Sequence, residues 1–86
     1  MDACVLVDKL LPLIQVRILR CRKANNPQVI FCDKLVDQLM QILPKDEYQS
    51  TAHVLMEALN KNKMGVKTLE FYHKDGISSI DMVINL

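Results

Sequence analysis

The sequence predicts an all-α domain of five or six helices. Half of the 86 residues are hydrophobic, which is enough for one buried core without support from a metal or a disulfide. Apolar residues recur at intervals of three and four through most of the chain, as they do on the buried faces of helices. The one Asp-Gly pair, Asp75–Gly76, follows helical spacing and does not read as a hairpin turn. We therefore expect residues 1–86 to form a single helical domain.

Residues 2–23 are predicted to form a first helix that is kinked near Pro12, because proline removes one internal hydrogen bond. The expected buried face is a stripe of apolar residues with helical spacing, made up of Val7, Leu10, Leu11, Ile14, Ile18 and Cys21. Residues 24–28 then form a loop, since Asn26 precedes Pro27 and is pushed away from helical geometry.

A second helix is expected to begin at Pro27 or Gln28 and to end at Pro44. Its inward side repeats at three and four through Phe31, Cys32, Leu35, Val36, Leu39, Ile42 and Leu43. The polar segment 44–49 is too short for more than a single turn.

The rest of the chain is interpreted as further helices. Ser50 or Thr51 can cap a helix with Val54, Leu55, Ala58 and Leu59 facing inward. Another element over 66–74 is expected to end with Gly76 in a C-cap. Ser78 or Ser79 then caps a last short helix that holds Ile80, Val83 and Ile84. Segments 28–31 and 78–86 contain β-branched runs, so periodicity alone leaves a strand open as the alternative for both.

Composition points away from several functional classes. Eleven basic and ten acidic residues give a net charge of +1, so no global field attracts polyanions. Three cysteines, Cys4, Cys21 and Cys32, lack a metal-binding spacing and suit reduced thiols. The N-terminal residues do not have the pattern of a signal peptide, and no apolar run is long enough for us to expect a membrane span. We expect a soluble cytoplasmic protein with no metal, no cofactor and no membrane contact.

The sequence also predicts no catalytic residues and no small-molecule substrate. It contains no nucleophile elbow, no Gly-rich phosphate loop and no acidic pair at a spacing typical of a catalytic site. His53 and His73 are expected on solvated outer faces. Cys21 and Cys32 fall on predicted apolar faces, where free cysteine acts as a small hydrophobe. The chain is therefore not expected to be an enzyme.

Sorting the charges by helical angle gives two candidate binding faces. The first is basic and lies opposite the apolar stripe of the first helix, with Arg17, Arg20 and Lys23, whereas Arg22 lies nearer the core edge. The second is acidic and comprises Asp33, Asp37, Asp46 and Glu47. Both could simply be solvated faces. If they bind, one copy can dock its basic face on the acidic face of another in a contact that propagates.

The order of elements resembles that of a caspase recruitment domain (CARD) of the death-fold superfamily over about residues 5–86. The resemblance rests on the kinked first helix and on "CDKLVDQLMQ", "ILPKDEYQ", "AHVLMEAL", "KMGVKTLEFYHKDG" and "ISSIDMVINL". It implies an antiparallel Greek-key bundle, here with a very short or missing third helix. It also implies a non-catalytic module for homotypic assembly in apoptotic or innate-immune signalling. The implied partner is another CARD or death-fold protein, or a second copy, bound through the two charged faces.

Two other functions stay open on the sequence. One is a small helical nucleic-acid-binding domain that lays its first helix along a phosphate backbone, although the near-neutral charge and few aromatic residues make nucleic acid an unfavoured partner. The other is an obligate helical dimer of another family.

Overall fold

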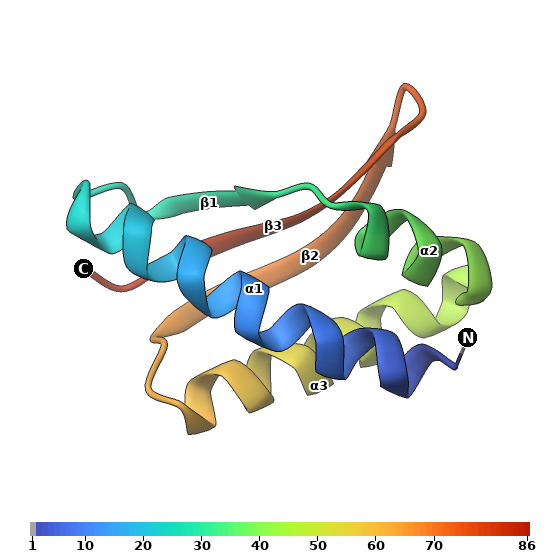
Figure 1. Cartoon of the computed structure of the whole chain (residues 1–86), viewed down its shortest axis with the longest axis horizontal. Helices are drawn as coiled ribbons and strands as arrows, with labels where there is room; N and C mark the ends of the chain where they lie inside the picture. Colours follow the sequence, from blue (N-terminus) through green and yellow to red (C-terminus); the bar gives the residue numbers. More distant parts are fainter. Residues whose placement is uncertain (1) are drawn as a thin grey trace.

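Three helices pack on one face of a three-stranded antiparallel sheet in the computed structural model, which describes residues 2–86 (Figure 1). The elements follow one another as α1 (Ala3–Lys23), β1 (Gln28–Phe31), α2 (Lys34–Ile42), the 3₁₀ turn η1 (Lys45–Glu47), α3 (Tyr48–Lys61), β2 (Val66–Lys74) and β3 (Ile77–Ile84). The predicted all-α bundle is therefore wrong, and so is the Greek-key death fold.

The first helix carries the buried face that the sequence predicts. Leu10, Ile14 and Ile18 are fully buried, and Leu6 joins them, while the flanking residues Val7, Leu11 and Cys21 pack against this core. The helix runs through Pro12 without interruption, as one element over Ala3–Lys23, and the predicted bend near Pro12 stays a prediction. A proline in mid-helix removes only one hydrogen bond, and the buried stripe on both sides of it holds the helix together.

The predicted second helix is divided into a strand and a shorter helix. Asp33 caps α2 by accepting a hydrogen bond from the Leu35 amide at 2.8 Å, which fixes the start of the helix there. The preceding residues form β1, in which Val29 and Phe31 are buried. Cys32, predicted on an apolar face, is exposed between the two elements.

The next two elements agree with the sequence more closely. The segment after Pro44 makes a single 3₁₀ turn, as predicted. Helix α3 then begins at Tyr48, before the predicted caps at Ser50 and Thr51. Its buried side includes Leu55 and Leu59, as expected, together with Ala52, whereas Val54 is 58% exposed.

The sheet has the strand order β1-β3-β2, with both neighbours antiparallel to β3. In β3 the buried residues alternate, with Ser78, Ile80, Met82 and Ile84 facing the helices. The predicted helices over 66–74 and 78–86 are therefore wrong. Residues four apart, such as Ile80 and Ile84, lie on the same side both in a strand and in a helix. The apolar spacing of this segment is therefore compatible with a short helix as well.

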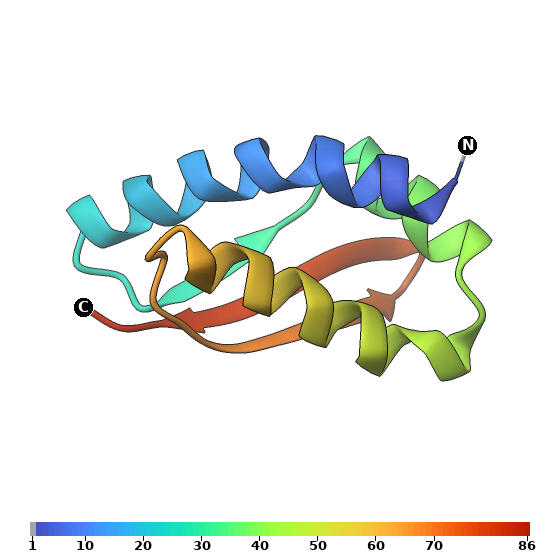
Figure 2. The same cartoon turned by 90° about the horizontal axis from the view of Figure 1, so that it is seen from below.

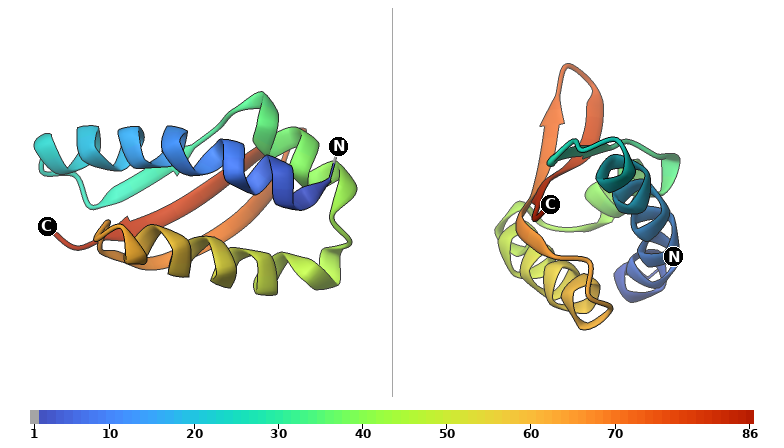
Figure 3. Two further views of the ribbon diagram at one scale, coloured as in Figure 1. Left: turned by 60° about the horizontal axis from the view of Figure 1, so that its bottom comes forward. Right: turned by 90° about the vertical axis from the view of Figure 1, so that its left-hand side faces the viewer.

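A two-residue turn at Asp75 and Gly76 joins β2 to β3. The backbone φ angles are 55° at Asp75 and 76° at Gly76, and the flanking residues Lys74 and Ile77 pair in register. Positive φ at both central positions is typical of the type I′ hairpin turn that Asp-Gly favours. Gly76 is thus not the C-cap of a helix. The tip of this hairpin extends beyond the helices (Figures 1 and 3).

Replacing Gly76 with valine is expected to lower the free energy of unfolding by about 1–2 kcal/mol, because a β-branched residue resists positive φ. A Cβ atom at this position meets no atom within 4 Å, so the cost is conformational and not steric. The measurement is the urea midpoint at an unchanged m-value. The control Asp75→Asn keeps the turn type and should be near neutral; an equal loss in both variants would contradict the turn assignment.

The helices leave the other face of the sheet uncovered. Helix α1 lies near β1 and α3 lies along β2, on the same side of the strands (Figures 2 and 3). The buried residues of all three strands point to this side. On the opposite side Ile30 is 58% exposed and Tyr72 is 50% exposed. The domain is thus a two-layer structure with one open sheet face and two sheet edges.

Candidate functional site

The structure divides the predicted basic face. Arg20 and Lys23 are exposed on α1, whereas Arg17 is half-buried. Arg17 Nη1 donates to the carbonyl oxygen of Ile30 at 3.2 Å, and its guanidinium carbon lies 5.8 Å from the centre of the Phe31 ring, within cation–π range. Arg17 thus has partners inside the chain. A partner-binding role for the basic face stays a prediction.

The predicted acidic residues also differ in their surroundings. Asp33 is occupied by the α2 amide that it caps. Asp37 is half-buried on α2, and Asp46 and Glu47 are exposed on η1. The binding role of these four carboxylates stays a prediction, but Asp33 already stabilises a helix end.

Both histidines lie at the surface, as the sequence predicts. His53 Nε2 is 2.9 Å from a carboxylate oxygen of Glu57, and both side chains are more than half exposed. His73 Nδ1 is 2.8 Å from the hydroxyl oxygen of Ser78 across the β2–β3 hairpin. The contact provides a hydrogen-bond partner for Ser78, which is only 4% exposed. Each histidine therefore has a structural partner.

The outer edge of β1 is partly capped by side chains. The Ile84 amide donates to the Pro27 carbonyl at 2.9 Å, so by alternation the peptide groups of Gln28 and Ile30 point away from β3. The side chain of Asn26 accepts from the Gln28 amide at 3.1 Å. Arg17 donates to the Ile30 carbonyl, as described above. Two of the outward peptide groups on this edge are thus already occupied.

The beginning of the β2 edge is capped as well. Asn60, near the end of α3, accepts from the Val66 amide at 2.7 Å and donates to the Val66 carbonyl at 3.0 Å. The side-chain amide takes the place that a neighbouring strand would have. A register irregularity follows between Val66 and Thr68, which is the position of a β-bulge.

Beyond the bulge, β2 has an uncapped edge. Thr68, Glu70 and Tyr72 pair with Val83, Asp81 and Ser79 of β3. The Ile84 amide bonds toward β1, and successive residues of a strand direct their peptide groups to alternate sides. Val83, Asp81 and Ser79 therefore direct their N–H and C=O groups toward β2. The residues between them on β2, namely Leu69, Phe71 and His73, therefore direct their N–H and C=O groups outward. Within residues 2–86 we find no hydrogen bond to these outward groups. The term free edge is used below for Leu69, Phe71 and His73.

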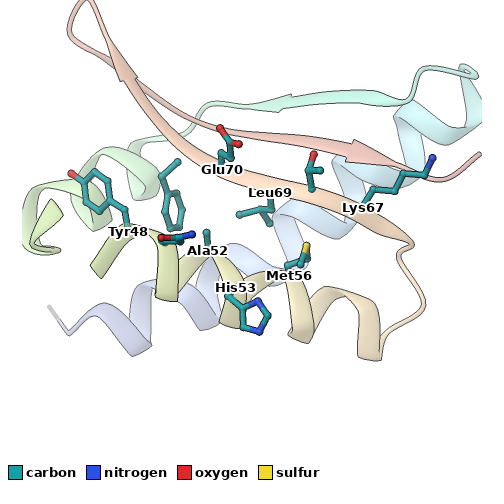
Figure 4. A pocket seen from close by; sticks show the side chains of 10 residues that line it. Tyr48, Ala52, His53, Met56, Lys67, Leu69 and Glu70 are labelled. Carbon is teal, nitrogen blue, oxygen red and sulfur yellow. The ribbon is translucent and has the colours of Figure 1, made fainter. Parts of the chain in front are cut away.

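A groove of about 480 Å³ runs between the free edge and α3 (Figure 4). Its apolar lining comes from Ala52 and Met56 on α3 and from Leu69 and Phe71 on β2. Tyr48 closes one end, where its ring packs edge-on against Phe71 with centroids 6.1 Å apart. Figure 4 shows Leu69 directed toward the helices and Glu70 directed to the opposite side of β2.

The groove also has a polar rim. Gln49 and His53 line it on α3, and Lys67 and Glu70 line it on β2. From Tyr48 to Met56 the helix rises about 12 Å, and from Lys67 to Phe71 the strand extends about 13 Å. The groove therefore has room for about four residues of an extended chain.

A metal centre or a membrane span would require features that the described part of the chain lacks. No three or more His, Cys, Asp or Glu side chains in residues 2–86 are placed to hold a metal ion. No helix among the same residues is long and apolar enough to cross a bilayer.

Comparison with known proteins gives no match: no family model, no curated protein and no solved structure aligns significantly with the chain.

Sequence reasoning missed the free edge for a specific reason. The available signal was the Asp75–Gly76 pair, which joins β2 to β3, the strand in which buried residues alternate. Reading that pair as a hairpin would have revealed an edge strand. The cap by Arg17 joins residues 13 positions apart, and the cap by Asn60 joins a helix end to a strand start six residues later. Neither spacing belongs to a helix or strand repeat, so hydrophobic periodicity does not indicate these caps.

Proposed function

We propose that the chain is a non-catalytic protein-interaction module that binds an extended peptide as a fourth strand on β2. The observation that carries the proposal is the contrast between the sheet edges. Side chains occupy two of the four outward peptide groups on β1 and both of those of Val66 on β2. The three N–H and three C=O groups of Leu69, Phe71 and His73 have no hydrogen bond within residues 2–86, and Leu69 and Phe71 line an apolar groove. Strand addition uses this combination of an unpaired edge and side-chain pockets.

The geometry also supports a chemical description of the peptide. Alternate side chains of an added strand fall on the helix side of the sheet. These side chains would enter the groove against Ala52, Met56 and Phe71, so they are apolar and two residues apart. Lys67 lies at the end of the groove away from Tyr48 and favours a carboxylate there. The peptide is thus extended, with apolar residues at alternating positions and an acidic residue at one end.

The general role predicted from the sequence, a module that binds another protein, is kept in this proposal, but the partner is different. A homotypic death-fold contact requires the six-helix bundle, which this chain does not form. The free edge requires only that the partner supply an extended segment.

The test begins with peptides selected from a random library on the immobilised chain. Amide chemical shifts of the chain then locate the peptide, and the largest changes are expected at Leu69, Phe71 and His73. Each amide of a selected peptide is next methylated in turn. Every second methylation should weaken binding by about tenfold or more, because it removes a main-chain hydrogen bond and adds a clash. A flat response along the peptide, shifts confined to α1, or failure to select any peptide would overturn the proposal.

A matched pair of variants tests the same edge from the side of the protein. His73→Pro removes an outward N–H and leaves the pairing of Tyr72 with Ser79 intact, so it should weaken peptide binding by about three- to tenfold. The control His73→Ala loses the same contact with Ser78 but keeps the N–H, and should bind nearly as the parent does. Equal affinities for both variants would contradict strand addition at this position.

A further inference from the structure

The uncovered sheet face carries a second candidate surface. Its members are Ile30 on β1, Thr68 and Glu70 on β2, and Asp81 and Val83 on β3, which are neighbours in the strand register. The term open face is used below for these five residues. They line a shallow hollow of about 300 Å³. Ile30 is 58% exposed there, so the open face combines apolar side chains with two carboxylates.

The two carboxylates lie directly opposite each other. Glu70 and Asp81 are register partners, which places their Cβ atoms about 5 Å apart, and like charges at that position repel. Ser79 donates a hydrogen bond to Asp81 at 2.9 Å. The lysines of β2 are Lys67 and Lys74, three and four residues along the strand from Glu70, or about 10 Å and 13 Å. Among residues 2–86, neither lysine forms a salt bridge with Glu70 or Asp81. The pair thus favours a cationic group from outside the molecule.

The outward side of α1 has the complementary character. Leu13, Val16 and Leu19 are between 41% and 53% exposed, and Arg20 and Lys23 are exposed beside them. At 100° per residue these five residues fall within about 120° of the helix circumference, opposite the buried stripe. The term outer stripe is used below for these five residues.

The two surfaces match in charge and in spacing. Arg20 and Lys23 are three residues apart on a helix, which separates their Cβ atoms by about 5–6 Å, close to the separation of Glu70 and Asp81 across the strands. The apolar residues Val16 and Leu19 lie next to the cations, as Ile30 and Val83 lie next to the carboxylates. The two carboxylates of the open face therefore have two matching cations on the outer stripe, and both surfaces have apolar residues beside these charges.

We infer that the open face of one copy of this chain binds the outer stripe of α1 of a second copy. The outer stripe points away from the sheet and the open face points away from the helices, so each copy keeps one surface free after binding. Such a head-to-tail contact propagates and does not close into a dimer. The open face shares Thr68 and Glu70 with the rim of the peptide groove. Its residues Ile30, Asp81 and Val83, and all five residues of the outer stripe, lie outside that groove.

The experiment is light scattering of the full chain over a range of concentrations and salt. At low ionic strength the weight-average mass should at least double between about 20 μM and about 500 μM, and about 0.5 M salt should reverse the increase. A mass that stays at one chain overturns the inference, and so does a mass that stops at two chains. Peptide binding is measured separately, so failure here leaves the proposed function standing.

Charge-reversed variants test directly whether the two surfaces bind each other. Arg20→Glu with Lys23→Glu makes the outer stripe acidic, and Glu70→Lys with Asp81→Lys makes the open face basic. Each double variant alone should stay monomeric, and their equimolar mixture should regain the mass increase, because each surface again meets its opposite charge. The control Lys34→Glu with Lys45→Glu reverses two exposed charges on α2 and η1 and should assemble like the parent. A mixture that stays monomeric overturns the inference.

Discussion

Replacing Ile80 with alanine is expected to lower the free energy of unfolding by about 3–4 kcal/mol, the largest effect of the substitutions considered. Ile80 is fully buried in the central strand β3, where its register partners are Phe31 on β1 and Phe71 on β2. Deleting a buried isoleucine side chain loses its transfer free energy and leaves a cavity, at a typical cost of about 2–5 kcal/mol. Urea denaturation at 25 °C measures the change.

Two neighbouring substitutions make the comparison diagnostic for the fold. In the structure Met82 is 2% exposed and faces the core, whereas Val83 is only half-buried and lies on the opposite side of the sheet. Met82→Ala should therefore cost about 2–3 kcal/mol and Val83→Ala less than about 1 kcal/mol. A helix would instead bury Val83 with Ile80 and Ile84. A loss at Val83 as large as that at Ile80 would contradict β3.

The N-terminal helix shows what the sequence predicts well. Its inward residues repeat over several turns, and an amphipathic pattern of that length has one structural solution. Leu10, Ile14 and Ile18 were predicted inward and are buried. The same applies to Leu55 and Leu59 on α3. These predictions succeed because each depends only on neighbours within the helix.

The strands were missed because their stabilising partners are distant in sequence. Val29 pairs with Met82, near the other end of the chain, and nothing local at residues 28–31 indicates that pairing. Residues 31, 32 and 35 continued the helical spacing of α2, so β1 was assigned to that helix. Asp75–Gly76 was the decisive local signal, since both residues adopt positive φ. Reading it as a helix end removed the whole sheet from the prediction.

The candidate sites were limited in a similar way. Sorting charges by angle identified Arg20 and Lys23 as outward residues, and both are exposed. The same sorting placed Arg17 with them, but an angle on one helix gives no information about the carbonyl of Ile30 that Arg17 reaches. The free edge of β2 is defined by the lack, within residues 2–86, of a side chain or strand that bonds to its outward peptide groups. This lack can be recognised only once the positions of all three strands are known.

Replacing Arg22 with methionine is expected to lower the free energy of unfolding by about 2 kcal/mol. Arg22 Nη2 donates to the Met64 carbonyl at 2.6 Å and to the Asn85 carbonyl at 3.2 Å, so it connects the end of α1 to the chain before β2 and to the chain after β3. Charge-assisted hydrogen bonds contribute about 1.5–3 kcal/mol each, and partial exposure reduces this. Methionine keeps most of the apolar stem, which isolates the loss of the donors.

Arg20→Met is the matched control, because Arg20 is two residues away on the same helix and exposed. It should change the free energy of unfolding by less than about 0.5 kcal/mol. Hydrogen exchange adds a local readout: the Asn85 amide, which donates to Gly65 at 2.8 Å, should lose protection in Arg22→Met and keep it in Arg20→Met. Gly65 itself has a φ of +66°, a conformation that favours glycine, and a Cβ there would lie 3.2 Å from Arg22 Nη2. Equal stability of the two variants would mean that Arg22 does not hold the ends of β2 and β3 in place.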